Sequence, residues 1–130
     1  MQRLSGSGRL ETSRYHDRPM LKTDTFAPPK AAQAAAARGV ALRSEFGRGG
    51  TSVGAGTARS LINGTPMGFD KLKQMSAFFI RHEKDKREGW SDASNPTNGY
   101  IAHLLWGGDS AKSWAIGIRA RAINAGVWYG

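Results

Sequence analysis

Cysteine is absent from this chain of 130 residues. Its absence excludes a disulfide framework and every thiolate metal site, and it fits a reducing compartment. Long apolar runs are missing too: no stretch approaches the ~20 residues needed to cross a bilayer, so we expect no membrane segment. The first ten residues, MQRLSGSGRL, contain no apolar core, so we also expect no secretory signal there.

Acidic residues are scarce. Ten aspartates and glutamates stand against nineteen lysines and arginines, which leaves a formal net charge of +9. This balance predicts a polyanionic neighbour (nucleic acid, an acidic protein surface or a membrane face) and says little about the fold. The candidate contacts are basic residues near the two ends of the chain: Arg3, Arg9, Arg14, Arg18, Lys112, Arg119 and Arg121.

Strand alternation and internal repeats are missing as well, whereas helical spacing recurs along the chain. A length of 130 residues suffices for one modest domain. We therefore predict a mainly α fold: a single small bundle of four or five helices with an extended basic N-terminal arm. The arm covers residues 1–27, the helical domain covers 28–125, and an apolar tail covers 126–130.

Three helices are predicted in the first two thirds of the chain. The first spans 30–46 and is rich in alanine. The second runs to residue 62 behind a Thr51 or Ser52 cap. The third spans residues 69 to about 87 and is the most clearly amphipathic. Their predicted apolar contacts are Val40, Leu42 and Phe46 in the first, Val53, Leu61 and Ile62 in the second, and Phe69, Leu72, Met75, Phe79 and His82 in the third.

A helix–turn–helix corner around two glycines contains the densest group of large apolar side chains, within residues 100–115. Gly107 and Gly108 are expected to end its first helix, and Asp109 or Ser110 to cap its second. One helical stripe of the first helix contains Tyr100, Ile101, Leu104 and Leu105. The side chains expected inside the bend and the second helix are Trp106, Trp114, Ile118 and Ile123.

The glycine-rich stretch GRGGTSVGAG, residues 47–56, is the candidate anion site. It lacks the G-K-[ST] ending of a phosphate-binding loop. It does open a helix at Thr51, where free backbone N–H groups suit a phosphate. Arg48 adds a positive charge beside Gly49 and Gly50. A plain flexible joint is the alternative interpretation.

Signatures of catalysis and metal binding are missing. His82 and Glu83 do not form an H-E-x-x-H motif, and no G-x-S-x-G elbow surrounds a serine. Ser110 beside Asp109 suits helix capping better than nucleophilic attack. We therefore expect no enzyme activity, no metal, no cofactor and no small-molecule substrate.

Three stretches match one pattern in order: ARGVALRSEFGRGGTSVGAGTARSLING (37–64), KLKQMSAFFIRHEKDK (71–86) and GYIAHLLWGGDSAKSWA (99–115). Through them, residues 28–117 resemble a small uncharacterised domain of tailed-bacteriophage proteins. That domain is often found near, or fused to, head-morphogenesis and prohead-protease proteins. The resemblance implies a phage origin and a head-related role, and it supplies no reaction.

Two positions depart from the family pattern. An arginine pair usually precedes the Asn-Gly turn, whereas Arg59 stands alone here. If the family binds an anion through that pair, this chain keeps half of it, so the resemblance adds Arg59 to the candidate anion-binding residues. His103 stands where the pattern often has tryptophan.

Two functions follow as hypotheses. The first is a non-enzymatic structural protein of the phage virion (cement, decoration or minor capsid component) whose helical module docks on capsid or other virion proteins. Arm and tail would reach neighbouring subunits, with Val127, Trp128 and Tyr129 as docking contacts. This hypothesis places the protein in the virion, and in the host cytoplasm before assembly. The second is a phage-encoded nucleic-acid-binding protein that uses the basic arm and the glycine-rich helix start for phosphate contacts.

Overall fold

The computed structural model describes residues 19–129; residues 1–18 of the predicted arm and residue 130 lie outside that range. The described part contains five α-helices and one short 3-10 helix. They are α2 (Lys30–Phe46), α3 (Ser52–Ile62), α4 (Phe69–Arg81), η1 (Glu83–Asp85), α5 (Asn98–Leu105) and α6 (Gly108–Asn124). Between residues 19 and 129 there is no strand, only an isolated bridge between Phe26 and Met67. The predicted mainly α class is confirmed.

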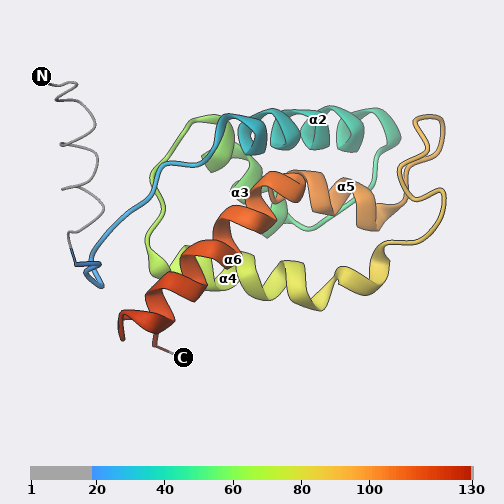
Figure 1. Ribbon diagram of the computed structural model, residues 1–130. Coiled ribbons are helices and arrows are strands. Elements are labelled where there is room, and N and C mark those ends of the chain that lie inside the picture. The colour runs from blue at the N-terminus through green and yellow to red at the C-terminus, as the bar shows by residue number, and fades with distance from the viewer. Residues whose placement is uncertain (1–18, 130) are drawn as a thin grey trace, which may run out of the picture.

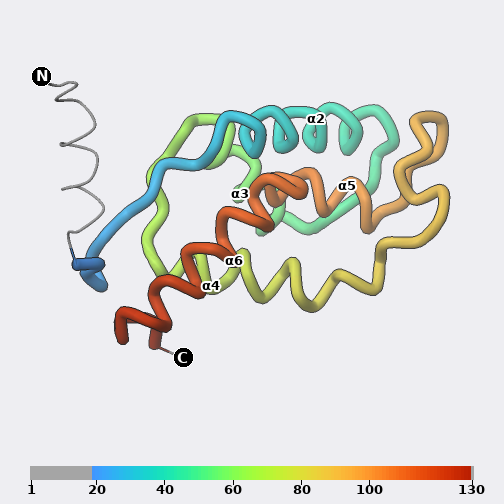
Figure 2. Tube along the Cα trace, in the orientation of Figure 1, coloured from blue at the N-terminus to red at the C-terminus, as the bar shows by residue number. Residues whose placement is uncertain are grey.

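The helices pack around the α5–α6 corner. In Figure 1, α2 runs along the top and α4 along the bottom, and the corner lies between them. α2 contacts α5, α3 and α6, while α4 contacts α6. The trace in Figure 2 shows that the long loop after η1 covers one end of the molecule before the chain enters α5. The glycine-rich joint between α2 and α3 begins at the same end.

The buried face of α2 is made of its smallest residues. Ala32 and Ala36 are fully buried, and Gly39 lies against the backbone of α5. The predicted apolar side of this helix packs only in part: Val40 is 42% exposed, whereas Leu42 is partly buried against the core. Close approach of the two helix backbones needs small side chains, and that requirement decides which face turns inward.

α4 is shorter than predicted, because it ends at Arg81 and not near residue 87. His82 leaves the helical conformation at φ −99° and ψ 10°. Its ring stacks on Phe78 at 4.5 Å, and its Nδ1 lies 2.8 Å from Asp85 Oδ2. These contacts turn the chain into η1. The predicted apolar stripe is confirmed, since Phe69, Leu72, Met75 and Phe79 are all buried.

Glycine, and not a polar cap, begins α6. Gly107 is the N-cap residue, with φ 106°, and Gly108 follows at φ 66°. Both values lie in the left-handed region, which favours glycine. The predicted capping by Asp109 or Ser110 is therefore wrong. A Cβ at Gly107 would lie 2.3 Å from the Ala111 Cβ, so the bend is too tight for a larger residue.

Tryptophans near the bend pack inside as predicted, although not equally. Trp106 is 6% exposed and stacks on Phe78 at 4.5 Å, whereas Trp114 is only partly buried. Ile118 is buried, but Ile123 is 47% exposed, contrary to prediction, because the last turn of α6 turns Ala122 and not Ile123 into the core.

α3 buries fewer of its predicted contacts. Its Thr51 cap is confirmed, with Oγ1 accepting a hydrogen bond from Gly54 N at 3.3 Å. Leu61 is fully buried, whereas Val53 is 49% exposed and Ile62 is 41% exposed. α3 therefore leaves apolar side chains exposed near both of its ends. Among the described residues, no helix is long and apolar enough to cross a membrane.

Candidate functional site

A hollow rich in basic residues lies at the end of the molecule where the α2–α3 joint meets the loop before α5. We call it the basic hollow. Its volume is about 490 Å³. Its lining residues are Arg48, Lys84, Asp85, Arg87, Asn95, Pro96, Thr97, Asn98 and Gly99. Three cations thus face one carboxylate, so the hollow favours an anionic occupant.

Arg48 is held in place by the loop before α5. Its Nη2 donates to Asn95 Oδ1 at 2.7 Å and to the Pro96 carbonyl at 3.0 Å. Its guanidinium also lies over the Phe46 ring, 5.5 Å from the centroid. The joint is therefore tied to a loop nearly fifty residues further along the chain, and the guanidinium is fixed at the wall of the basic hollow.

Three of the five predicted anion-site residues share one hollow: Arg48, Gly49 and Gly50 line a space of about 420 Å³ together with Arg43 and Gly47. Gly49 is buried against Ile101, where a Cβ would come within 2.4 Å, and Gly50 packs on Leu105. Their conformational freedom therefore serves the packing of the joint on α5. Thr51 Oγ1 is used as the cap of α3. Arg59 lies in a different hollow from Arg48.

Lys84 and Arg87 line the basic hollow but were not among the predicted contacts. Two acids next to Lys84, Glu83 and Asp85, have other partners. Glu83 Oε1 lies 2.7 Å from Lys112 Nζ and 3.4 Å from Lys86 Nζ, and Asp85 pairs with His82. One signal was present in the sequence: positions 84 and 87 are three apart, which puts them on one side of a helical turn.

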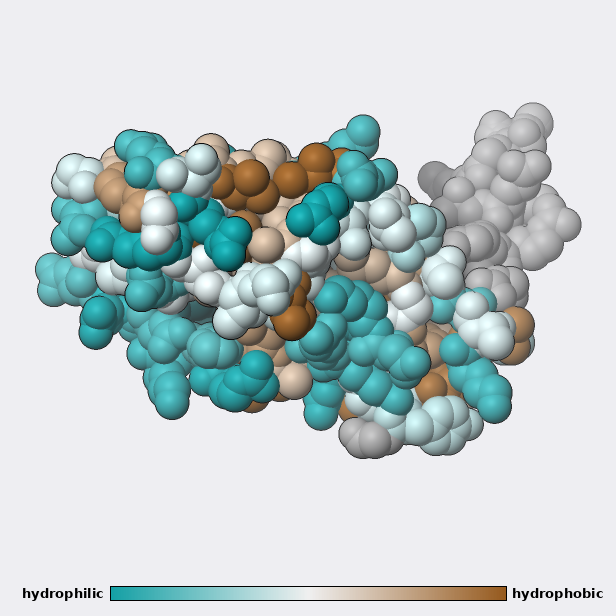
Figure 3. All heavy atoms as spheres, turned by 180° about the vertical axis from the view of Figure 1, so that it is seen from behind, coloured by the Kyte–Doolittle hydropathy of each residue, from teal (hydrophilic) through white to brown (hydrophobic). Residues whose placement is uncertain are grey.

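A second hollow lies between α2 and α3, and we call it the apolar hollow. Its volume is about 450 Å³. Its lining residues are Val40, Arg43, Ser44, Ala55, Arg59, Ile62 and Leu105. Seen from behind, hydrophobic residues interrupt the hydrophilic surface along the upper part of the molecule, where α2 lies (Figure 3). Arg43 Nε donates to the Gly49 carbonyl at 2.9 Å, while no described residue accepts a hydrogen bond from Arg59.

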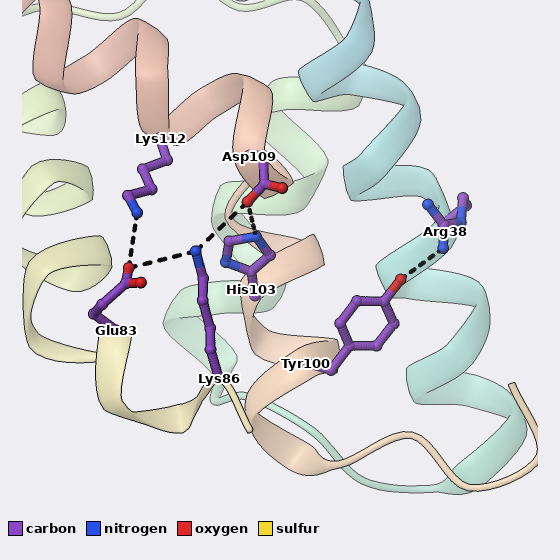
Figure 4. A network of polar contacts seen from close by, with 7 residues as sticks. All are labelled: Arg38, Glu83, Lys86, Tyr100, His103, Asp109 and Lys112. Atoms are coloured by element: carbon purple, nitrogen blue, oxygen red, sulfur yellow. Dashed lines mark hydrogen bonds and ion pairs between the residues drawn. The ribbon is translucent and has the colours of Figure 1, made fainter. Parts of the chain in front are cut away.

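A polar network joins η1, α5 and α6 (Figure 4). His103 Nε2 lies 3.0 Å from Asp109 Oδ1, and Lys86 Nζ lies 3.7 Å from the same oxygen. Lys112 reaches Glu83 from α6. Because an ionised carboxylate only accepts hydrogen bonds, Nε2 of His103 donates to Asp109. The network links both helices of the α5–α6 corner to η1 and the residue after it.

Burial lowers the pKa of His103 below its ordinary value of 6.5, and this effect outweighs the opposite pull of Asp109. Lys86 and Lys112 act in the same direction as burial. The ring is 7% exposed and packs between Phe79 and Trp90, with ring centroids 5.5 Å and 5.2 Å away. His103 is therefore a neutral core histidine at neutral pH, in a position with no nucleophile among its hydrogen-bond partners.

The C-terminal tail packs largely on its own domain. Val127 and Trp128 lie against the core, and Trp128 meets Phe69 edge to face at 6.0 Å. Lys73 Nζ lies over the Trp128 ring at 5.7 Å. Of the three predicted docking residues, Tyr129 is the most open, at 59% exposure.

The predicted polyanion contacts separate into three groups. Arg3, Arg9, Arg14 and Arg18 lie outside the described residues. Lys112 is engaged with Glu83, and that hydrogen bond raises its pKa above 10.5. Arg119 and Arg121 lie near the end of α6, at the opposite end of the molecule from the basic hollow (Figure 1), and form no side-chain hydrogen bond within residues 19–129.

Metal ligands do not converge in the part of the chain that the structure describes: no group of three or more His, Asp or Glu side chains there is arranged to hold an ion. His16 lies outside that part. Comparison with known protein families, with curated proteins and with solved structures found no match to this chain.

Proposed function

We propose that this chain is a non-enzymatic structural protein of a tailed-bacteriophage virion, acting as a cement, decoration or minor capsid component. Its helical domain docks on another virion protein, in the host cytoplasm during assembly and afterwards in the particle. The proposal is supported by the sequence pattern of residues 28–117 and by one structural observation, the apolar hollow between α2 and α3.

The apolar hollow has the composition of a protein contact. Val40 is 42% exposed and Ile62 is 41% exposed, and both line it. Covering such side chains removes apolar surface from water and stabilises a complex by about 25 cal/mol per Å², before the costs of association. The occupant that fits is a segment of a virion protein with apolar side chains in the hollow.

The positive charge around the apolar hollow indicates more closely which kind of partner segment would fit it. Arg59 and Arg43 stand on the wall of the apolar hollow, and the whole chain carries a net charge of +9. An acidic side chain on the partner segment would therefore pair with Arg59, which has no acceptor among residues 19–129. Such rim charges raise the association rate and select the orientation of the partner.

The experiment begins with purified particles of the phage that encodes the chain, analysed by mass spectrometry. We expect the protein to be present, and its absence would contradict the proposal. Particles assembled with Ile62→Asp should then incorporate at least about tenfold less protein, because the aspartate removes an apolar contact and repels the acidic side chain that the partner would place beside Arg59. The matched control is Ile80→Asp on α4, where the isoleucine is 58% exposed and lines neither hollow.

A phage-encoded nucleic-acid-binding protein is the second candidate function. Two basic regions support it: one is the basic hollow, and the other is the last part of α6 with Arg119 and Arg121, a helix whose end lies at the opposite end of the molecule from the loop before α5 (Figure 1). Phosphate contacts by lysine and arginine predict a steep loss of DNA affinity as salt rises. Binding measured from about 50 to 200 mM salt tests this candidate, and an absence of binding at the lowest salt would exclude it.

A further inference from the structure

The basic hollow is built from segments that are far apart in the chain. Arg48 comes from the joint after α2, Lys84 from η1, and Arg87 from the loop that follows. We propose that the basic hollow binds a phosphate group, held by these three side chains and by the N-terminus of α5. This site is separate from the apolar hollow, and its proposal does not depend on docking to a virion protein.

Arg48 is preorganised for such a ligand. Its Nη2 is anchored to Asn95 and Pro96, and within residues 19–129 no acceptor contacts its Nε or Nη1. A guanidinium fixed through one nitrogen keeps donors in a defined plane, which is the geometry that phosphate oxygens match. Less side-chain entropy is therefore lost when the ligand binds.

Lys84 and Arg87 have no acidic partner among the described residues, although both have acids nearby. Asp85 is the acid that lines the hollow, and its Oδ2 is occupied by His82 Nδ1 at 2.8 Å. Asp85 also packs against α5, where a Cβ on Gly99 would come within 2.9 Å of the Asp85 Cβ. The two cations are therefore available to an anion from outside the chain.

Backbone donors add to these charges. Thr97 caps α5 by accepting from Tyr100 N at 3.1 Å. The N–H groups of Asn98 and Gly99, which also line the hollow, find no acceptor within the described part of the chain. Free N–H groups at a helix start add to a phosphate site that the cations have already defined.

The size of the hollow sets the class of ligand. A volume of about 490 Å³ lies within the range of roughly 300–1,000 Å³ typical of small-molecule sites. The phosphate group can therefore belong to a free phosphate or nucleotide, or to the backbone of a nucleic acid. All of these share the same phosphate chemistry, so one experiment with separate arms covers them.

The experiment is a ¹H–¹⁵N NMR titration of the full chain. Its three probes are inorganic phosphate, a nucleoside 5′-monophosphate, and a single-stranded decanucleotide without terminal phosphates. We expect saturable shifts of the Asn98 and Gly99 amide signals with at least one probe. Saturation by a monophosphate assigns a small phosphate ligand, and saturation by the decanucleotide alone assigns a nucleic-acid backbone.

Two charge-matched variants distinguish binding in the basic hollow from nonspecific attraction of an anion to a positively charged protein. Lys84→Gln with Arg87→Gln removes two unpaired cations from the hollow and should weaken binding about tenfold or more. Lys22→Gln with Lys30→Gln removes the same charge from exposed positions that line neither hollow and should leave the affinity within about twofold. Equal weakening by both variants, or no saturable shift at Asn98 and Gly99 with any probe, would overturn the proposal.

Discussion

Gly39 of α2 lies in direct contact with the backbone of Leu105 in α5. A Cβ added to Gly39 would come within 2.7 Å of the Leu105 nitrogen and 3.0 Å of the Leu104 carbonyl carbon. Backbone atoms inside a helix cannot move aside as the end of a flexible side chain can. This contact sets how closely α2 approaches the corner, and through it the positions of both hollows.

Replacing Gly39 with alanine should destabilise the fold. Alanine favours a helix by about 1 kcal/mol over glycine, but overpacking against a fixed backbone costs about 1–3 kcal/mol. We expect the free energy of unfolding to fall by up to about 2 kcal/mol in urea denaturation. The matched control is Gly117→Ala in α6, where no atom lies within 4 Å of the added Cβ. It should raise stability by about 0.5–1 kcal/mol, and a similar gain for Gly39→Ala would contradict this account.

Ser76 provides a second test of the core. It is 1% exposed, and its Oγ has no hydrogen-bond partner in the described part of the chain. A buried hydroxyl without a partner costs about 1–3 kcal/mol of desolvation, so Ser76→Ala should raise the free energy of unfolding by about 1 kcal/mol. Ser113→Ala, on the exposed side of α6, controls for the better helix propensity of alanine. A clear loss of stability for Ser76→Ala relative to this control would disprove the prediction.

His103 should make stability depend on pH. Burial lowers its pKa in the folded chain below 6.5, so the unfolded chain binds more protons between the two pKa values. The free energy of unfolding therefore rises with pH through that window and levels off above about 6.5. The pKa values of Glu83 and Asp92 are lowered by hydrogen bonds from Lys112 and Ser94 respectively. Their contribution to stability is therefore lost only at more acidic pH.

The measurement for His103 combines an NMR titration of its ring with urea denaturation at several pH values. We expect the ring to titrate below 6.5 and His103→Gln to flatten the rise of stability toward neutral pH. A ring that titrates above 6.5 would mean that attraction by Asp109 exceeds the cost of burial.

Residues that act through local chemistry were predictable. Thr51 caps α3, Gly47 ends α2 at φ 65°, and the spacing of Phe69, Leu72, Met75 and Phe79 placed all four in the core. Each depends on backbone conformation or on the period of a single helix, both of which are written in neighbouring residues. Of the residues in the predicted anion site, Arg48 lines the basic hollow, whereas Lys84 and Arg87 were not predicted to lie near it.

The sequence by itself determined the helices, the two-glycine bend and the strongly basic character of this protein, because helix periodicity, capping and charge are local or additive properties. Tertiary packing alone decided that α2 turns its alanines inward and that Val40 and Ile62 remain partly exposed. It also decided that Arg48 lines the same hollow as Lys84 and Arg87. Those outcomes depend on how closely two backbones approach and on which distant acids neutralise which cations. Neither quantity exists until the chain has folded.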